Sequence, residues 1–299
     1  MKYLFFICVC LCLAACNSHP EQEPEEEPCP GPDLNSRFVY GDIPNLAVRL
    51  AYMGMERPAD SYNYQLYPGM EEWAKTREER LAANQVEPEC ILRKMSTQAV
   101  IQAIWEMPQC GEFFWVTEGY WQRIIESQIN RYNSFQELTK RKDAGAALLA
   151  RLSLVDPITV HYLYTETQVL ELLLSQPVFL SQLNESEKRK VVEITLSNDK
   201  KRQQAEWWWG EGDGYYNHSA VVSRSPALIL MGKTMLAAGY RPLIEAVNKN
   251  EELRCFIDGF CNPHIPNSNT GYSYLSIYPN TDRNVPQIII DYAKNYIND

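Results

Sequence analysis

Hydrophobic residues recur at intervals of three and four positions through most of the chain beyond residue 96, the spacing of amphipathic helices. Ser96 can cap a helix with apolar residues at Val100, Ile101, Ile104 and Trp105. Asp143 starts the alanine- and leucine-rich segment 143–152, which has high helix propensity. Another segment is expected to begin at Ser225-Pro226 and to end at Gly239, because glycine readily adopts the left-handed conformation that ends a helix. Alternation of apolar and polar residues, which is typical of strands, is confined to short segments such as 271–278. The pattern predicts an all-α protein.

The boundaries between these segments suggest a repeated arrangement. Ser134 and Glu137 have the spacing of a capping box, and residues 186–204 have the narrow apolar face of an outer helix. A helix, a proline break and a second apolar helix recur around Pro108, Pro177 and Pro242. Residues 241–257 add one or two helices, and Pro286 opens the last one. We expect stacked helical hairpins, arranged as a solenoid-like array or as an irregular bundle.

The N-terminus has the features of an export signal. One cation, Lys2, precedes an apolar run that ends in small residues, so residues 1–15 are predicted to be a signal peptide. Leu13-Ala14-Ala15-Cys16 resembles a bacterial lipobox, which implies that Cys16 is acylated and becomes the mature N-terminus. Asn17, rather than aspartate, follows this cysteine and favours the outer membrane. A plain signal peptide and a short anchor are the alternatives.

Residues 16–36 are predicted to be a disordered tether. Residues 17–36 contain five Glu and five Pro and almost nothing apolar, so they lack the hydrophobic surface needed to fold. At about 3.1 Å per residue such a chain reaches roughly 60 Å. Its acidic cluster resembles the surface-export signals of Bacteroidetes lipoproteins, and a solvated spacer is the alternative. Residues 37–299 are then expected to form a single α-helical domain.

The composition excludes some partners and chemistries. The 299 residues carry a net charge of −10, whereas a protein that binds nucleic acid without sequence preference needs a basic surface, so nucleic acid is not an expected partner. No GxSxG, HExxH, phosphate loop or dinucleotide fingerprint occurs in the mature chain. No cofactor and no catalytic residue are therefore assigned.

Five cysteines remain once the signal peptide and Cys16 are set aside: Cys29, Cys90, Cys110, Cys255 and Cys261. An odd number spread over a long chain is not a disulfide scaffold, and the absence of CxxC spacing disfavours structural zinc. Bridges between Cys90 and Cys110 or between Cys255 and Cys261 are both open at this point. The sequence leaves the pairing undecided.

Three segments are similar to a family of Bacteroidetes lipoproteins with no assigned activity. They are SYNYQLYPGMEEW (61–73), ECILRKMST (89–97) and NSFQELTKRKDAGAALL (133–149), and the closing NVPQIIIDYAKNYI resembles the last helix of that family. The resemblance implies a helical, lipid-anchored body in which these motifs serve packing and capping. It carries over no functional residue.

The most unusual local feature is an aromatic cluster followed by a glycine-rich stretch. Aromatic rings beside acidic and amide groups bind sugar rings through apolar faces and hydrogen bonds. The alternative is that the tryptophans pack between helices. Asp213 and nearby oxygens do not have the spacing of a calcium loop, so no metal site is predicted. The candidate ligand-binding residues are Trp207, Trp208, Trp209, Asp213, Tyr215 and Tyr216.

The first functional hypothesis is a lipid-anchored helical lipoprotein of the outer membrane, facing outside or the periplasm, that binds a protein or a glycan. The first alternative is a hydrolase of envelope or polysaccharide and peptide substrates, using Cys110 or a carboxylate pair near Trp207. Cys110 lacks the motif of a papain-like nucleophile and is interpreted as a small buried apolar residue. The second alternative is a structural envelope lipoprotein.

Overall fold

The computed structural model describes residues 57–68, 70–73, 75–108, 121–155, 157, 163–205, 216–259 and 285–299, except the side chains of 163–166, 205 and 216–223. Within these ranges the chain forms helices and no strand, so the all-α prediction is confirmed. The helices are α2 (Arg77–Ala83), α3 (Cys90–Lys94), α4 (Thr97–Glu106), α6 (Trp121–Arg131), α7 (Asn133–Lys140), α8 (Ala144–Leu154), α9 (Leu163–Leu174), α10 (Pro177–Leu180), α11 (Glu185–Ala205), α12 (Tyr216–Ala237), α13 (Arg241–Lys249), α14 (Glu251–Ile257) and α15 (Val285–Asn298).

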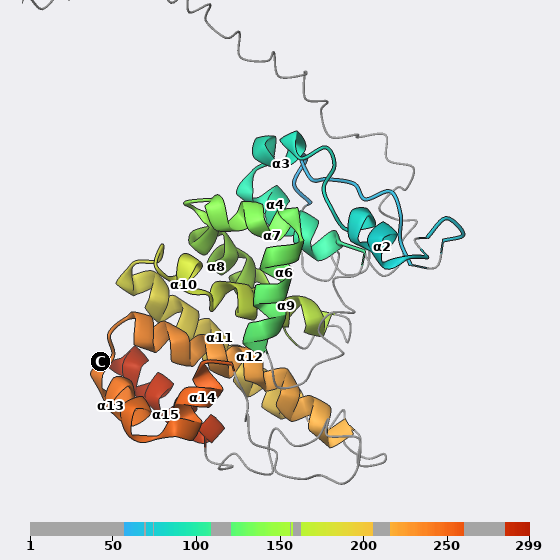
Figure 1. The fold of residues 1–299 in the computed structure, drawn as a ribbon. Helices are drawn as coiled ribbons and strands as arrows, with labels where there is room; N and C mark the ends of the chain where they lie inside the picture. The colour runs from blue at the N-terminus through green and yellow to red at the C-terminus, as the bar shows by residue number, and fades with distance from the viewer. Residues whose placement is uncertain are drawn as a thin grey trace, which may run out of the picture.

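The helices follow one another through the molecule largely in the order of the sequence. Figure 1 shows α3, α4 and α7 near one end and α13, α14 and α15 at the other, with α8, α9 and α11 between them. α4 packs on α7 and α8, α9 packs on α8 and α12, and α15 packs on both α11 and α12. Apolar side chains from α4, α7, α8, α9, α12 and α15 join one buried core. Stacking buries the apolar face of each helix against its neighbours, as expected for hairpins that cannot bury it alone.

The motif segments of the sequence meet in the first half of the molecule. Ser96 caps α4 by accepting a hydrogen bond from the Ala99 N–H at 3.2 Å, as predicted. The Thr97 hydroxyl donates to the Asp143 carboxylate at 2.7 Å, and the Arg141 guanidinium donates to the Leu92 carbonyl at 2.6 Å. These contacts join the segment 89–97 to the segment 133–149. Asp143 precedes α8, but its side chain makes no capping hydrogen bond there, because it accepts the Thr97 hydroxyl instead.

Two predicted helix starts are wrong. Ser134 does not cap a helix: α7 begins at Asn133, two residues before the start that a Ser134 cap implies. Glu137 pairs with Arg141 at 2.7 Å. α12 begins at Tyr216 and runs through Pro226. Proline costs an interior helix one hydrogen bond, and tertiary contacts offset this cost. Arg224, two residues before the proline, forms an ion pair with Asp199 of α11 at 2.7 Å.

The later boundaries agree with the sequence. Gly239 follows α12 with φ +71°, the left-handed conformation expected of a helix-ending glycine. Residues 241–257 form two helices, α13 and α14, which Asn250 separates. Ile289, Ala293 and Tyr296 of α15 are buried, as their spacing predicts.

The prediction that 186–204 forms an outer helix holds only for its first part. Asn198, Asp199 and Arg202 in the last turns of α11 are all buried. Arg202 forms an ion pair at 3.0 Å with Glu171 of α9, which is fully buried. Burial raises the pKa of Glu171 to about 7, and the nearby Arg202 charge only partly opposes this effect. The helix pattern missed these contacts because charged residues are normally read as solvent-facing.

Candidate binding cavity

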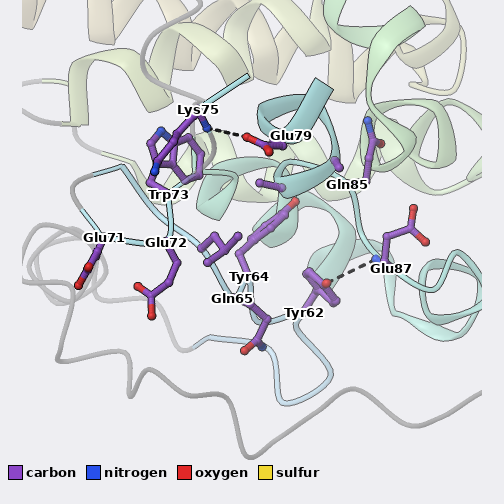
Figure 2. Close-up of a pocket in the computed structure, with 13 residues that line it drawn as sticks. Tyr62, Tyr64, Gln65, Glu71, Glu72, Trp73, Lys75, Glu79, Gln85 and Glu87 are labelled. Carbon is purple, nitrogen blue, oxygen red and sulfur yellow. Dashed lines mark hydrogen bonds between the residues drawn. The ribbon is translucent and has the colours of Figure 1, made fainter. Parts of the chain in front are cut away.

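A cavity of about 650 Å³ lies between the irregular segment 62–73, α2 and the chain that follows α2 (Figure 2). We call it the Tyr62–Trp73 cavity. Its volume is within the range of small-molecule sites. The lining residues combine aromatic, acidic and amide side chains with a few small apolar ones: Tyr62, Tyr64, Gln65, Leu66, Glu71, Glu72, Trp73, Lys75, Glu79, Ala82, Ala83, Gln85 and Glu87.

The centre of the cavity is formed by two tyrosines. Tyr64 is buried, and its hydroxyl donates to the Ala103 carbonyl in α4 at 3.0 Å. Its ring meets the Tyr62 ring edge to face, with centroids 5.0 Å apart. Such edge-to-face pairs are favoured by the ring quadrupoles. Tyr62 therefore rests on an immobilised neighbour and keeps part of its ring exposed to the cavity.

A buried ion pair holds this segment against the helical body. The Arg57 guanidinium binds both carboxylate oxygens of Glu106 at 2.8 Å, and Glu106 is 2% exposed. The same guanidinium donates to the Tyr62 carbonyl at 2.8 Å and to the Asn63 side chain at 2.7 Å. A paired guanidinium with further acceptors is a geometrically specific contact. Residues 57–63, which have no helix or strand of their own, are thus fixed on the end of α4.

The opposite wall is fixed by a reciprocal set of amide contacts. The Asn133 side chain accepts from the Val86 N–H at 3.0 Å and donates to the Val86 carbonyl at 2.9 Å. The Asn133 N–H donates to the Gln85 side-chain oxygen at 2.9 Å. These three bonds attach the chain after α2 to the start of α7. Both walls of the cavity therefore depend on partners more than forty residues away in the sequence.

α2 begins with a capping box that also sets the charge of one lining residue. Thr76 accepts from the Glu79 N–H at 3.1 Å, and Glu79 accepts from the N–H groups of Thr76 and Lys75 at 2.9 and 2.8 Å. The N–H donors of Thr76 and Lys75 lower the pKa of Glu79, so this carboxylate stays ionised at neutral pH. Figure 2 shows Glu79 beside Lys75 and Trp73.

The rim of the cavity is acidic. Four glutamates and one lysine line it, and all of their side chains are exposed: Glu71, Glu72, Glu79, Glu87 and Lys75. Glu71 and Glu87 form no ion pair within the described part of the chain, so their oxygens can accept hydrogen bonds from a ligand. Burial, together with the Glu87 charge, raises the pKa of Tyr62, so its phenol stays protonated. Trp73 is half-buried and adds a second aromatic surface.

The sequence-based candidates are not the residues that line this cavity. Trp207, Trp208, Trp209, Asp213 and Tyr215 lie outside the described residues, as do Cys16 and Cys110. Tyr216 is the first residue of α12, and its side chain is not described. The prediction of a ligand site around these residues stays a prediction.

Sequence reasoning missed Tyr62, Trp73 and Glu87 as site residues. The segment 61–73 was interpreted through its resemblance to a family motif, and therefore as a packing element. Its aromatic residues have no helical period and are interrupted by Pro68 and Gly69, which is typical of an irregular segment. Aromatic side chains on such a segment, next to several glutamates, were the available signal.

The cysteines give one further result. Cys90 is disulfide-bonded to a cysteine outside the described residues. Cys255 is a half-buried thiol, so the Cys255–Cys261 bridge is not formed. In the described ranges no group of three or more metal-ligating side chains is close enough to hold an ion, and no helix has the length and apolar character to span a bilayer. No family model, curated protein or solved structure matches the chain.

Proposed function

We propose that this protein is a lipid-anchored lipoprotein of the outer membrane that binds a saccharide in the Tyr62–Trp73 cavity. One observation carries the binding part of the proposal: two partly exposed aromatic rings, Tyr62 and Trp73, line a cavity whose rim consists of carboxylates and amides. The proposed ligand site is therefore formed by residues 62–87 of the helical body.

The chemistry of a sugar ring fits this lining. A pyranose has apolar C–H faces that stack on aromatic rings, and hydroxyl groups around its edge that need hydrogen-bond partners. Glu71 and Glu87 offer acceptors for those hydroxyls, and the exposed Gln65 offers a further polar group. The Arg57–Glu106 pair and the Asn133 contacts preorganise both walls, which reduces the entropy lost on binding.

The location rests on the N-terminal sequence and on one covalent bond. The lipobox-like segment ending at Cys16 supports acylation, and the acidic stretch 17–36 supports a tether that holds the body away from the membrane. The disulfide at Cys90 supports an oxidising compartment outside the cytoplasm. Display on the cell surface, rather than toward the periplasm, is the version we favour because the acidic tether resembles a surface-export signal.

Binding is tested with the full-length protein reconstituted in lipid nanodiscs, first on a glycan array and then by titration calorimetry with the best saccharide. Trp73→Ala should weaken binding about tenfold or more, because it removes a stacking surface. Tyr292→Ala is the matched control, since it removes a half-buried aromatic ring from α15, far along the chain from the cavity. Equal affinity in wild type and Trp73→Ala would contradict this site, and no bound glycan on the array would contradict saccharide binding.

Location is tested separately. Metabolic labelling with a palmitate analogue should mark the wild-type protein and not Cys16→Ala. Protease added to intact cells should digest the body if it faces outward, whereas protection until lysis would place it in the periplasm. A protein that is neither labelled nor membrane-bound would overturn the anchor.

The residues of the hydrolase alternative, Cys110 and the carboxylates near Trp207, lie outside the described part of the chain. Among the residues that line the cavity, Glu79 has a lowered pKa, which is unsuitable for a general acid.

A further inference from the structure

A second cavity, of about 500 Å³, lies in the other half of the molecule. It is formed by the start of α6, the chain from the end of α9 through α10, and parts of α11 and α12, helices that neighbour one another in Figure 1. Its walls are mainly apolar and include Pro177, Leu180, Leu236 and Ala237. Its charged lining residues are Lys188, Lys233 and Asp258. We call it the Lys233 pocket.

Lys233 forms an uncommon contact for a lysine. It lies near the C-terminal end of α12, is half-buried, and donates from Nζ to the Gln122 side-chain oxygen at 2.5 Å. Gln122 in turn donates to Glu126 at 2.9 Å and to Gln176 at 2.8 Å. Within the described part of the chain, Lys233 has this one neutral acceptor and forms no ion pair. Two of its three ammonium protons are left for another acceptor.

The surrounding charges do not neutralise Lys233 directly. Asp258 and Glu126 act on it only at longer range, and burial outweighs them and lowers the pKa of Lys233. The other lysine of the pocket, Lys188, is already paired with Glu185 at 2.9 Å and also donates to the Ala237 carbonyl. The pocket therefore combines one unpaired, partly desolvated ammonium group with one neutralised lysine.

From this arrangement we propose that the Lys233 pocket binds a small amphiphilic carboxylate. The carboxylate accepts hydrogen bonds from Lys233 Nζ, and the hydrocarbon part packs on Pro177, Leu180 and Leu236. A partly buried cation without a counterion is costly, and a ligand that supplies the counterion recovers part of that cost. The apolar walls favour a hydrocarbon body over a highly hydrated anion such as phosphate. This site is separate from the saccharide site and does not depend on it.

The charge of the ligand is the discriminating feature. Hexanoate, hexanol and hexylamine have the same hydrocarbon body and differ in the head group, so they separate ion pairing from apolar burial. Calorimetry with full-length protein in nanodiscs, with empty nanodiscs as the blank, should show hexanoate binding at least about tenfold more tightly than hexanol. Hexylamine should not bind. Equal binding of hexanoate and hexanol, or no detectable hexanoate binding, would overturn the proposal.

Three variants test the role of the ammonium group. Lys233→Met keeps the length and apolar stem of the side chain and should abolish the preference for hexanoate over hexanol. Lys233→Arg keeps the charge and should retain the preference, which separates loss of charge from misfolding. Lys294→Met is the control: it removes an exposed lysine of α15 that pairs with Asp291 and does not line the pocket, so it should leave the preference unchanged. An unchanged preference in Lys233→Met would contradict the assignment.

The pH dependence gives an independent readout on the wild-type protein. Hexanoate is already ionised at neutral pH, so its affinity should fall as Lys233 loses its proton, at a pH below the ordinary range for lysine. Asp258, Glu126 and Lys188 are the other charged groups that face this lysine or its pocket. A flat affinity between neutral pH and pH values around the normal pKa of lysine would count against an ammonium–carboxylate contact.

Discussion

The contact between α8 and α10 depends on the missing side chain of Gly145. A Cβ atom at this position would lie 2.5 Å from the backbone oxygen of Phe179, 3.1 Å from the Gln182 Cβ and 3.2 Å from a methyl carbon of Leu183. The Gly145 N–H also donates to the Gln182 side chain at 2.8 Å. Because the nearest atom belongs to the backbone, α10 must shift to accommodate even one methyl group in Gly145→Ala.

Two opposing effects decide whether Gly145→Ala raises or lowers the free energy of unfolding. Alanine is better than glycine inside a helix by about 1 kcal/mol. Overpacking in a close contact costs about 1–3 kcal/mol, and the approach to a backbone atom places this position at the upper end. The net expectation is a loss of about 1–2 kcal/mol in the free energy of unfolding, which lowers Tm by a few degrees for a body of this size.

Thermal and urea unfolding of the full-length protein, followed by circular dichroism, measure this effect. Ala146→Gly is the matched control: Ala146 is the next residue in α8 and is exposed, so it should show only the loss of about 1 kcal/mol in helix propensity. If Gly145→Ala instead raises the unfolding free energy by about 1 kcal/mol, propensity alone operates, and the reasoning from the close approach of α8 and α10 is refuted.

Three further predictions concern buried charges and a helix cap. Because the pKa of Glu171 is raised from 4.5 to about 7 in the folded protein, its contribution to stability is present below pH 4.5 and is lost as the pH rises to about 7. The free energy of unfolding should fall by about 3 kcal/mol over this range, and Glu171→Gln should flatten this part of the pH–stability curve in urea titrations. Glu106→Gln should cost about 1.5–3 kcal/mol in urea unfolding, because Arg57 keeps an acceptor but loses its counter-charge, and unchanged stability would refute the anchoring role of this pair. Asn250 caps α14 by accepting a hydrogen bond from the Leu253 N–H at 3.0 Å. Asn250→Ala should therefore lower the free energy of unfolding by about 1 kcal/mol in thermal unfolding, whereas Asn250→Ser should retain most of the stability.

Local signals predicted much of the helical body. The cap at Ser96, the stop at Gly239 and the buried face of α15 were all correct, because each depends on residues within one or two turns. The capping box at Ser134 was wrong although its spacing fits. Tyr132 provides the actual helix start, and the Glu137 carboxylate is engaged by Arg141 instead of by a backbone N–H. A spacing rule cannot see that competing partner.

The cavities could not be predicted in the same way. The Tyr62–Trp73 cavity needs Arg57 to meet Glu106 and Val86 to meet Asn133, pairs separated by 49 and 47 residues. In the Lys233 pocket, Lys233 meets Gln122 across 111 residues. Nothing in the sequence near Lys233 distinguishes it from the other lysines, and only the folded chain brings its ammonium group to the Gln122 side chain at the start of α6.

The amino-acid sequence by itself determined the helical class, several helix ends and the N-terminal pattern from which the anchor is proposed, because these depend on periodicity, capping and composition over short stretches. The tertiary structure alone decided that Pro226 stays inside a helix, that Glu171 and Arg202 are buried together, and that two cavities form. In each of these cases the stabilising contacts join residues far apart in the sequence. They exist only in the folded chain, and they offset an arrangement that is locally unfavourable.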